Sequence, residues 1–184
     1  MVVSSFAMFG LLEAINVGKT ASRHRDDMDE GSEADYVFDI QGNCDNTAVV
    51  ASLSSMSLSA FDIATMKCVA KLDGAHSDRI NGIEFFRTNP SILVTTSDDE
   101  SVRIWDLRAA GGVTAQPVLN IRTSGEVMDV SVGPNDAMLA CAIGNGVSFY
   151  DIRQNTTGSS PGSCLGDYSD VNTDFLTQVK FHPL

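Results

Sequence analysis

The Gly18-Lys19-Thr20 triplet is the part of this sequence that comes nearest to a phosphate-binding motif. A nucleotide-binding loop of the form G-x-x-x-x-G-K-[ST] cradles phosphates with the backbone N–H groups of its glycine-rich turn. The first glycine of such a loop would stand at position 13, where this chain has Glu13. A carboxylate at that place repels phosphate, and no βαβ pattern follows it. A nucleotide-binding enzyme is therefore an alternative that the sequence disfavours.

The other residues that could perform acid–base or metal chemistry are scattered along the chain. His24, His76 and His182 stand in unrelated contexts, and no H-E-x-x-H, G-x-S-x-G or G-x-G-x-x-G motif occurs. The acidic run Asp98-Asp99-Glu100 has no further ligands at the spacing of a calcium loop. We therefore expect a protein that is not an enzyme, with no catalytic residue, no bound metal and no cofactor.

The charge balance argues against nucleic acid as a partner. The 184 residues include 24 acidic and 12 basic side chains, which gives a formal net charge of −12. Binding to phosphate backbones needs a basic stripe that releases counterions, and the sequence has none. No apolar run is long enough to cross a bilayer, so we expect no membrane partner. With 43% hydrophobic and 20% charged residues, the composition is that of a globular protein.

Four cysteines, Cys44, Cys68, Cys141 and Cys164, lie far apart and include no C-x-x-C pair. A disulfide framework is usually denser in cysteine, and a zinc site shows close pairs. The interpretation we favour is reduced, mostly buried thiols in a cytoplasmic or nuclear protein.

Residues 1–34 read as a leader and an acidic linker ahead of the folded part. Met1–Leu12 is apolar, but no basic residue precedes it as in a secretory signal, so we expect one strand at most. Arg23–Asp35 carries six acidic residues and almost nothing to bury, which predicts a disordered, solvated segment.

A repeat of about 45 residues runs through the rest of the chain. Ser59–Ile63, Arg103–Leu107 and Ser148–Ile152 each place an aromatic residue before an aspartate and an aliphatic residue. Their aspartates are 44 and 45 residues apart, because 106 − 62 = 44 and 151 − 106 = 45. The repeat anchors are Phe61, Asp62, Trp105, Asp106, Tyr150 and Asp151. A shared period over two intervals predicts a repeat architecture.

Each repeat reads as four short strands joined by turns, with apolar residues on both faces. Opening strands are predicted at Ile80–Phe85, Val127–Val132 and Leu176–Phe181, second strands at Thr47–Leu53, Ile92–Thr96 and Ala137–Ile143, and closing strands at Lys67–Leu72, Pro117–Ile121 and Ser163–Tyr168. Between second and third strands, Gly144-Asn145-Gly146 is a strong hairpin signal, because Gly and Asn tolerate positive φ. Small sheets with two apolar faces are typical of β-propeller blades.

The second unit resembles the WD-repeat family. It contains Gly74-Ala75-His76, a small-hydroxyl strand at Ile92–Ser97, an acidic turn at Asp98-Asp99 and Trp105-Asp106 at the end of its third strand. The resemblance implies an all-β fold: an incomplete WD-repeat β-propeller of about three four-stranded antiparallel blades plus the first strand of a fourth. The blades would span approximately residues 35–73, 74–122 and 123–168, with the next strand at 175–182.

In WD repeats a histidine, a Ser or Thr, an aspartate and the tryptophan form a buried hydrogen-bond relay. Carried over by position, the resemblance implies that His76, Thr95, Asp99 and Trp105 form it, with Ser97 as the alternative to Thr95. Such a chain of donors and acceptors satisfies a buried carboxylate, so we interpret His76 as structural and not catalytic.

The first and third units lack this relay. Counting back ten positions from Phe61 and Tyr150, as from Trp105 to Thr95, gives Ala51 and Ala140, which have no hydroxyl. Counting back six positions gives Ser55 and Gly144, which have no carboxylate. We therefore expect packing and strand pairing alone to hold these two units.

Three units and one further strand are fewer than the four to eight blades of a closed propeller. We expect this sequence to be a truncated product, a partial gene model or a piece completed by another chain, with six or seven blades in the full protein.

The predicted function is a scaffold that mediates protein–protein interactions. A sharper alternative is a substrate receptor of a cullin-RING ubiquitin ligase, because Trp105-Asp106-Leu107-Arg108 resembles the W-D-x-R box by which propellers contact the ligase adaptor, and Tyr150-Asp151-Ile152-Arg153 nearly repeats it. Arg108 and Arg153 are then the candidate adaptor-binding residues, since a guanidinium pairs well with acidic surfaces.

Overall fold

Three four-stranded antiparallel sheets make up the chain in a computed structural model, which describes residues 35–109, 116–153 and 161–182. The strands are β1 (Val37–Gly42), β2 (Ala48–Leu53), β3 (Leu58–Asp62), β4 (Cys68–Leu72), β5 (Ile80–Phe85), β6 (Ile92–Ser97), β7 (Ser101–Asp106), β8 (Leu119–Arg122), β9 (Val127–Val132), β10 (Met138–Ile143), β11 (Gly146–Asp151) and β12 (Ser163–Tyr168). A single turn of 3-10 helix, η1 (Leu107–Ala109), follows β7. The prediction of three antiparallel four-stranded units is confirmed.

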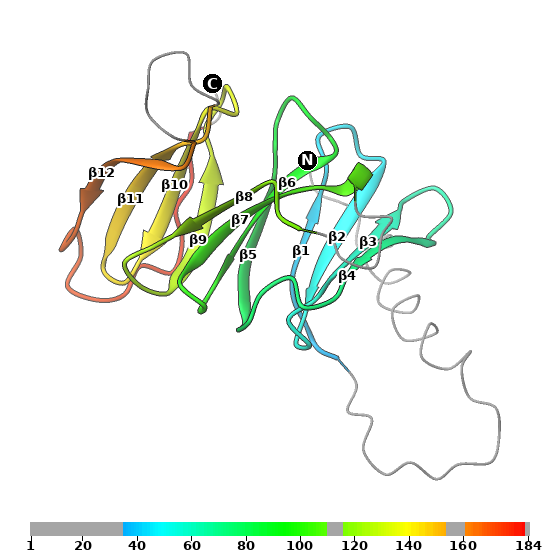
Figure 1. Cartoon of the computed structure of the whole chain (residues 1–184), viewed down its shortest axis with the longest axis horizontal. Helices are drawn as coiled ribbons and strands as arrows, with labels where there is room; N and C mark the ends of the chain where they lie inside the picture. The colour runs from blue at the N-terminus through cyan, green and yellow to red at the C-terminus, as the bar shows by residue number, and fades with distance from the viewer. Residues whose placement is uncertain (1–34, 110–115, 154–160, 183–184) are drawn as a thin grey trace, which may run out of the picture.

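Consecutive strands pair within each sheet, in the orders β1-β2-β3-β4, β5-β6-β7-β8 and β9-β10-β11-β12. We name these sheets blade 1, blade 2 and blade 3. The first strand of blade 2, β5, contacts the first strands β1 and β9 of its two neighbours, whereas β4 and β12 lie at opposite ends of the row (Figure 1). Within the ranges that the structure describes, no sheet pairs with another by a strand ladder, so the blades contact one another through their packed faces and through side-chain hydrogen bonds.

Blade 1 and blade 2 share one apolar core. Val50, Leu58 and Leu72 of blade 1 pack with residues of blade 2 that include Leu93 and Trp105. The next residue along β6, Val94, points the other way and belongs to the core between blade 2 and blade 3. Because successive side chains of a strand alternate between faces, a sheet between two neighbours needs apolar residues on both faces. The apolar character of both faces follows from this arrangement.

The second interblade core joins Val94, Val102 and Ile104 of blade 2 to β9 and β10 of blade 3, and it includes Cys141 and Tyr150. The aromatic anchors occupy equivalent places in the three sheets. Across the β2–β3, β6–β7 and β10–β11 pairs, Phe61 lies opposite Val49, Trp105 opposite Leu93 and Tyr150 opposite Leu139.

The strands define two edges of the row of blades. We call the edge at which β1, β5 and β9 begin the amino edge, and the edge at which they end the carboxyl edge. The β6–β7 turn and the β8–β9 loop lie at the amino edge, whereas the β7–β8 and β11–β12 connections lie at the carboxyl edge. In Figure 1 the carboxyl edge is uppermost.

The β10–β11 hairpin has the turn that the sequence indicates. Ile143 pairs directly with Gly146, so Gly144 and Asn145 alone form the turn, and Gly144 has a φ of 57°. In blade 2 the corresponding turn has three residues, because Ser97 pairs with Ser101. Because the turn of blade 3 is one residue shorter, a residue of β10 lies one position nearer in sequence to the aromatic anchor of its blade than the equivalent residue of β6 does.

The segment 175–182, predicted as the first strand of a fourth blade, runs beside β9 but forms no strand pairing within the described residues. Its contacts are to side chains: the Val179 N–H donates to Asp129 Oδ2 at 2.9 Å, and the Phe181 N–H donates to Ser131 Oγ at 3.0 Å. The same kind of bond joins blade 1 to blade 2, where the Ile83 N–H donates to Asp39 Oδ2 at 2.9 Å. By this correspondence Val179 stands where Ile83 stands, so the segment is a partial fourth blade.

The leader at residues 1–34, including Gly18-Lys19-Thr20, lies outside the described residues. In the part of the chain that the structure describes, no helix is both long and apolar enough to cross a membrane.

The expectation that most cysteines are buried is wrong. Cys141 is buried, but Cys44, Cys68 and Cys164 are exposed, and all four are free thiols. The exposed three lie in the β1–β2 turn and on the outermost strands β4 and β12, where no further sheet covers them.

Candidate functional site

Blade 2 brings His76, Thr95, Asp99 and Trp105 within hydrogen-bonding distance of one another. Thr95 Oγ1 lies 2.7 Å from His76 Nε2 and accepts a hydrogen bond from Trp105 Nε1 at 2.9 Å. On the other side of the imidazole, His76 Nδ1 lies 3.0 Å from Asp99 Oδ2. The four side chains thus form one continuous polar chain inside a sheet that is otherwise apolar.

The local sequence explains this placement. Thr95 lies in β6 two residues from Leu93, on the face toward blade 1, and Trp105 lies opposite Leu93 in β7. Asp99 is in the tight turn between these strands, from which its carboxylate reaches back to the loop that carries His76. Ser97, the alternative to Thr95, is not in the chain: its hydroxyl donates to the Asp78 carbonyl and accepts from the Asp99 N–H.

Two further residues of β7 complete the network, and the sequence analysis missed both. Ser101 Oγ lies 2.5 Å from Asp99 Oδ1. Arg103 donates from Nη2 to Asp99 Oδ2 at 3.1 Å, from Nη1 to the Ala75 carbonyl at 2.7 Å and from Nε to Ser101 Oγ at 3.2 Å. The available signal was the spacing Asp99-x-Ser101-x-Arg103, because Ser101 and Arg103 alternate along β7 and so share one face, next to the turn that holds Asp99.

Burial sets the protonation states in this network. Burial lowers the pKa of His76 to about 4, against the opposing attraction of Asp99, so the imidazole is neutral at pH 7. Burial alone would raise the pKa of Asp99, but hydrogen bonds from Ser101 and the Ser77 N–H and the nearby His76 lower it to about 2. The network therefore holds a neutral imidazole beside a carboxylate, and Arg103 balances the charge of that carboxylate.

The same groups are enclosed and do not face solvent. The side chains of His76 and Asp99 are 0% and 3% exposed. A general acid or base must reach within hydrogen-bonding distance of a reacting group. Because their polar atoms are already paired with one another and with the strands, the arrangement is suited to fixing the blade.

Blade 1 and blade 3 hold different residues in the same places. Across the β2–β3 pair, Ala51 occupies the position of Thr95, as the spacing indicates. In blade 3 the interpretation of Ala140 as the equivalent residue is wrong. The shorter β10–β11 turn moves the equivalence by one, so that Cys141 stands in the place of Thr95.

In blade 3 the Cys141 thiol and the Tyr150 ring replace the hydroxyl and the indole. Burial raises the pKa of the Cys141 thiol far above its ordinary value and that of Tyr150 to about 12, so both side chains stay neutral. In this sheet a side-chain hydrogen bond joins the two outer strands instead: Ser148 Oγ of β11 donates to Asp167 Oδ1 of β12 at 2.9 Å.

Arg108 and Arg153, the candidate adaptor-binding residues, lie at the carboxyl edge in matching geometry. Arg108 donates from Nε and Nη2 to both carboxylate oxygens of Asp106, and Arg153 does the same with Asp151. The two arginine side chains are 67% and 68% exposed. Asp62, the anchor of blade 1, instead accepts from the Thr65 N–H and hydroxyl.

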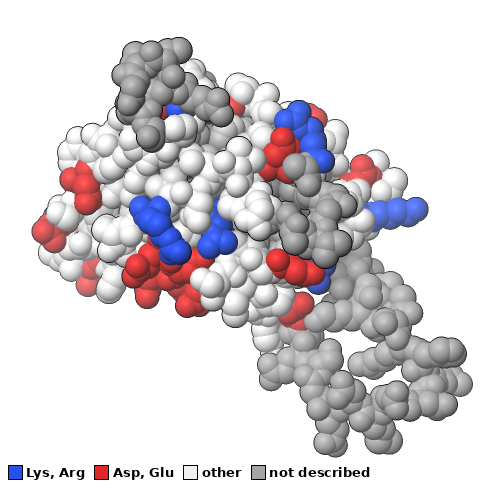
Figure 2. All heavy atoms as spheres, viewed as in Figure 1, with Lys and Arg blue, Asp and Glu red and all other residues white. Residues whose placement is uncertain are grey.

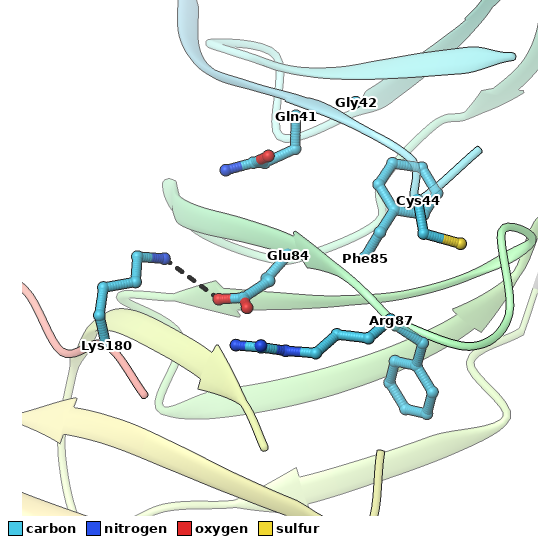
Figure 3. Close-up of a pocket in the computed structure, with 8 residues that line it drawn as sticks. Gln41, Gly42, Cys44, Glu84, Phe85, Arg87 and Lys180 are labelled. Carbon is cyan, nitrogen blue, oxygen red and sulfur yellow. Dashed lines mark hydrogen bonds and ion pairs between the residues drawn. The ribbon is translucent and has the colours of Figure 1, made fainter. Parts of the chain in front are cut away.

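A cavity of about 240 Å³ opens between blade 1 and blade 2 near the end of β5. Figure 3 shows Lys180 reaching Glu84, with an Nζ–Oε2 distance of 3.1 Å, while Arg87 and Gln41 line the same space. Arg87 is held by its Nε, which donates to the Val132 carbonyl at 3.2 Å. The charges in this cavity are mutually paired or anchored to the backbone. Within the described ranges, no three His, Cys, Asp or Glu side chains are grouped to hold a metal ion.

Comparison with known proteins shows similarity to one protein family and to one fold. The family described as "WD domain, G-beta repeat" matches residues 66–106, which run from the β3–β4 turn to the end of β7. The cell division cycle protein cdt2 of Schizosaccharomyces pombe is 25% identical over 170 residues, which cover 80% of this chain and 34% of that protein. The WD repeat-containing protein 89 homolog of Dictyostelium discoideum is 26% identical over 154 residues, 84% of this chain and 38% of that protein.

Among solved structures, the β-propeller domain of Cps50 (Swd1) from Myceliophteria thermophila superposes with a TM-score of 0.58. The match covers 71% of this chain and 40% of that chain at 18% sequence identity, which supports the fold alone. The prediction of an incomplete β-propeller is confirmed. The chain spans about a third of the length of the curated relatives that it matches.

Proposed function

Because this chain belongs to the WD-repeat family of β-propeller proteins, we propose that it is a non-enzymatic scaffold on which other proteins dock. Members of the family are in general rigid platforms for protein–protein interaction. We further propose that the chain works within a larger propeller and that neither nucleic acid nor membrane is its direct partner, since its net charge of −12 repels both phosphate surfaces.

One observation carries this proposal: the paired histidine and carboxylate that could serve as a base and an acid, His76 and Asp99, are enclosed inside blade 2. Strongly perturbed titratable groups in an open cleft are the usual mark of an active site. Here His76 and Asp99 are closed off from solvent and bonded to Thr95, Ser101 and Arg103. Their arrangement stabilises a platform, and the exposed loops at the two edges are left for contacts with partners.

The test is affinity purification of the tagged full chain from its own cells, with quantitative mass spectrometry. We expect a defined set of proteins to be enriched over a charge-matched tagged control, and no saturable binding of ATP or GTP in titrations to 1 mM. Saturable nucleotide binding, or the absence of any enriched protein, would contradict the scaffold proposal.

A second candidate is the receptor of a cullin-RING ubiquitin ligase, and the matching arginines at the carboxyl edge favour it. Arg108 and Arg153 are 45 residues apart and have the same two-point contact with the aspartate two positions earlier. The aspartate occupies one edge of each guanidinium and holds it in place. The remaining N–H groups face solvent, from which they could bind carboxylates of an adaptor.

Co-purification with the ligase adaptor tests this candidate. We expect the Arg108→Ala/Arg153→Ala variant to lose the adaptor while it keeps its other partners. The control variant Lys71→Ala/Arg122→Ala removes the same charge elsewhere and should keep the adaptor. If the double arginine variant retains the adaptor, the receptor role is excluded.

We also propose a cytoplasmic or nuclear location. Cys44, Cys68 and Cys164 are exposed free thiols, which suit a reducing compartment. Fractionation of cells that express the tagged chain should recover it with cytoplasmic or nuclear markers, and recovery with secretory markers would contradict the proposal.

A further inference from the structure

A cavity of about 340 Å³ opens at the amino edge between blade 2 and blade 3. Its wall combines two carboxylates with apolar side chains, and its main lining residues are Glu100, Ser124, Glu126, Met128, Ile143 and Phe175. Figure 2 shows acidic side chains gathered at the lower edge of the viewed face, which is the amino edge. The cavity is separate from the buried network of blade 2 and from the arginines of the carboxyl edge.

Two strands and three connecting segments position this wall. Glu100 is in the β6–β7 turn, where it has a φ of 59°. Glu126 ends the β8–β9 loop, whereas Met128 and Ile143 belong to β9 and β10. Phe175 comes from the segment that follows β12, and the Leu176 N–H fixes this segment by donating to the Gly144 carbonyl at 2.7 Å.

Among the residues that the structure describes, neither Glu100 nor Glu126 has a side-chain hydrogen bond or an ion pair. Arg122, the basic residue beside this loop, uses its Nη1 to donate to the Asp99 carbonyl at 3.1 Å. Both carboxylates are exposed, and a pair of exposed carboxylates beside an apolar wall attracts a cation that also carries apolar surface.

The apolar side chains of the wall favour a guanidinium over an ammonium ion. Phe175 is 73% exposed and is the aromatic residue that lines the cavity. A guanidinium stacks on an aromatic face, donates two parallel hydrogen bonds to a carboxylate and is less strongly hydrated than an ammonium ion. Met128 and Ile143 supply a surface for the three methylene groups that precede it.

We propose that this cavity binds an arginine side chain from a peptide segment of a partner protein. The guanidinium lies between Glu100 and Glu126 and against Phe175, and the aliphatic stem packs on Met128 and Ile143. This inference rests on the proposed scaffold function and gives that function one docking point of defined chemistry.

The experiment is an NMR titration of the full chain labelled at the methyl groups of Met and Ile. The probe is Nα-acetyl-arginine N-methylamide, added up to 20 mM, with the citrulline and lysine analogues as comparators. We expect saturable shifts at Met128 and Ile143 with the arginine probe, weaker ones with lysine and none with uncharged citrulline. Glu100→Gln/Glu126→Gln should raise the Kd of the arginine probe at least tenfold, and Phe175→Ala should raise it several-fold.

The matched control is Asp73→Asn/Asp78→Asn, which removes two carboxylates from the β4–β5 loop at the same edge. This variant should bind the arginine probe with an unchanged Kd. Absence of saturable shifts, equal shifts with citrulline, or an unchanged Kd in Glu100→Gln/Glu126→Gln would overturn the proposal, and tighter binding of lysine would overturn the assignment to arginine. Any of these results leaves the scaffold function intact, since that function is judged by partner enrichment.

Discussion

Blade 2 and blade 3 have the same strand order and the same core positions, but different chemistry holds each together. In blade 2 the hydroxyl of Thr95 joins His76 to Trp105, and Asp99 gathers Ser101 and Arg103. In blade 3 the corresponding interior is a thiol and a phenol ring that packs with apolar neighbours.

The difference separates two roles that a buried side chain can have. Strand pairing and apolar burial are sufficient to build the sheet, since blade 3 has a complete ladder from β9 to β12 without the network. The network of blade 2 adds directional bonds, which fix the β6–β7 turn to the loop that precedes β5. Because each partner in the network would be costly to leave unpaired, we expect blade 2 to tolerate substitution less than blade 3 does.

The largest difference in stability between blade 2 and blade 3 is expected when a carboxylate is removed from each. Asp99→Ala leaves Arg103 and His76 without their buried partner, and breaking such a pair costs about 3–5 kcal/mol of the free energy of unfolding. Asp167→Ala in blade 3 removes one exposed acceptor of Ser148 and should cost about 1 kcal/mol or less. Urea denaturation of both variants measures the contrast. Equal losses would show that the network does not set blade 2 apart.

Acid should destabilise the protein through blade 2. The folded pKa of His76 is about 4, against 6.5 as its ordinary value, so the unfolded chain takes up the proton first as the pH falls. Stability therefore declines from pH 6.5 to pH 4, by roughly 3 kcal/mol at 1.36 kcal/mol per pKa unit. Asp99, whose pKa is lowered to about 2 from 3.8, adds a loss only below pH 3.8.

Urea denaturation at pH 7 and pH 4.5 tests this dependence. We expect His76→Gln, although less stable at pH 7, to lose distinctly less stability than the unmodified chain between the two pH values. His182→Gln, which changes a histidine outside the network, should keep the full dependence. An unmodified chain whose stability is flat over this range would contradict the assignment of a neutral, buried His76.

Substitution of Thr95 in blade 2 and of Cys141 in blade 3 tests the contribution of the residue at this equivalent position. Thr95→Val conserves shape but leaves Trp105 Nε1 and His76 Nε2 without a partner, at a cost of about 2 kcal/mol. Cys141→Val at the equivalent place breaks no hydrogen bond and should cost at most about 1.5 kcal/mol. Thermal unfolding of the two variants should order them in this way, and the reverse order would show that packing outweighs the network.

The smallest effect is expected at the carboxyl edge, where the two blades are alike. The pairs Arg108–Asp106 and Arg153–Asp151 are exposed on their arginine sides, and exposed ion pairs contribute little to stability. Arg108→Ala and Arg153→Ala should therefore leave the Tm unchanged within error. A clear fall in Tm for one of them alone would show that the edges of the two blades are not equivalent.

Much of this molecule could be predicted from its residues. The period of 44 and 45 residues between anchor aspartates indicated three units, and the opening strands Ile80–Phe85 and Val127–Val132 were predicted with the bounds that the structure has. The closing strand Ser163–Tyr168 was also predicted with its observed bounds. These patterns depend on alternation and turn residues, which act over a few neighbouring positions.

Other features could not be predicted from the spacing of residues along the sequence. The place of Cys141 was missed because a turn shorter by one residue shifts the register between strands. The sequence did not predict that Arg103 belongs to the network, because its partners Asp99 and Ala75 come from different loops. The cavity between blade 2 and blade 3 was missed because Glu100, Glu126 and Phe175 meet only when two sheets are packed.

The sequence by itself therefore determined the units, the strands and the residues available to each interior. Local patterning is enough for this, because the side-chain alternation of a strand and the φ preferences of a turn are set within a few residues. Only the tertiary structure decided which side chains pair across turns and between blades. Those contacts depend on the exact register and stacking of sheets, and a shift of one residue moves a side chain to the opposite face.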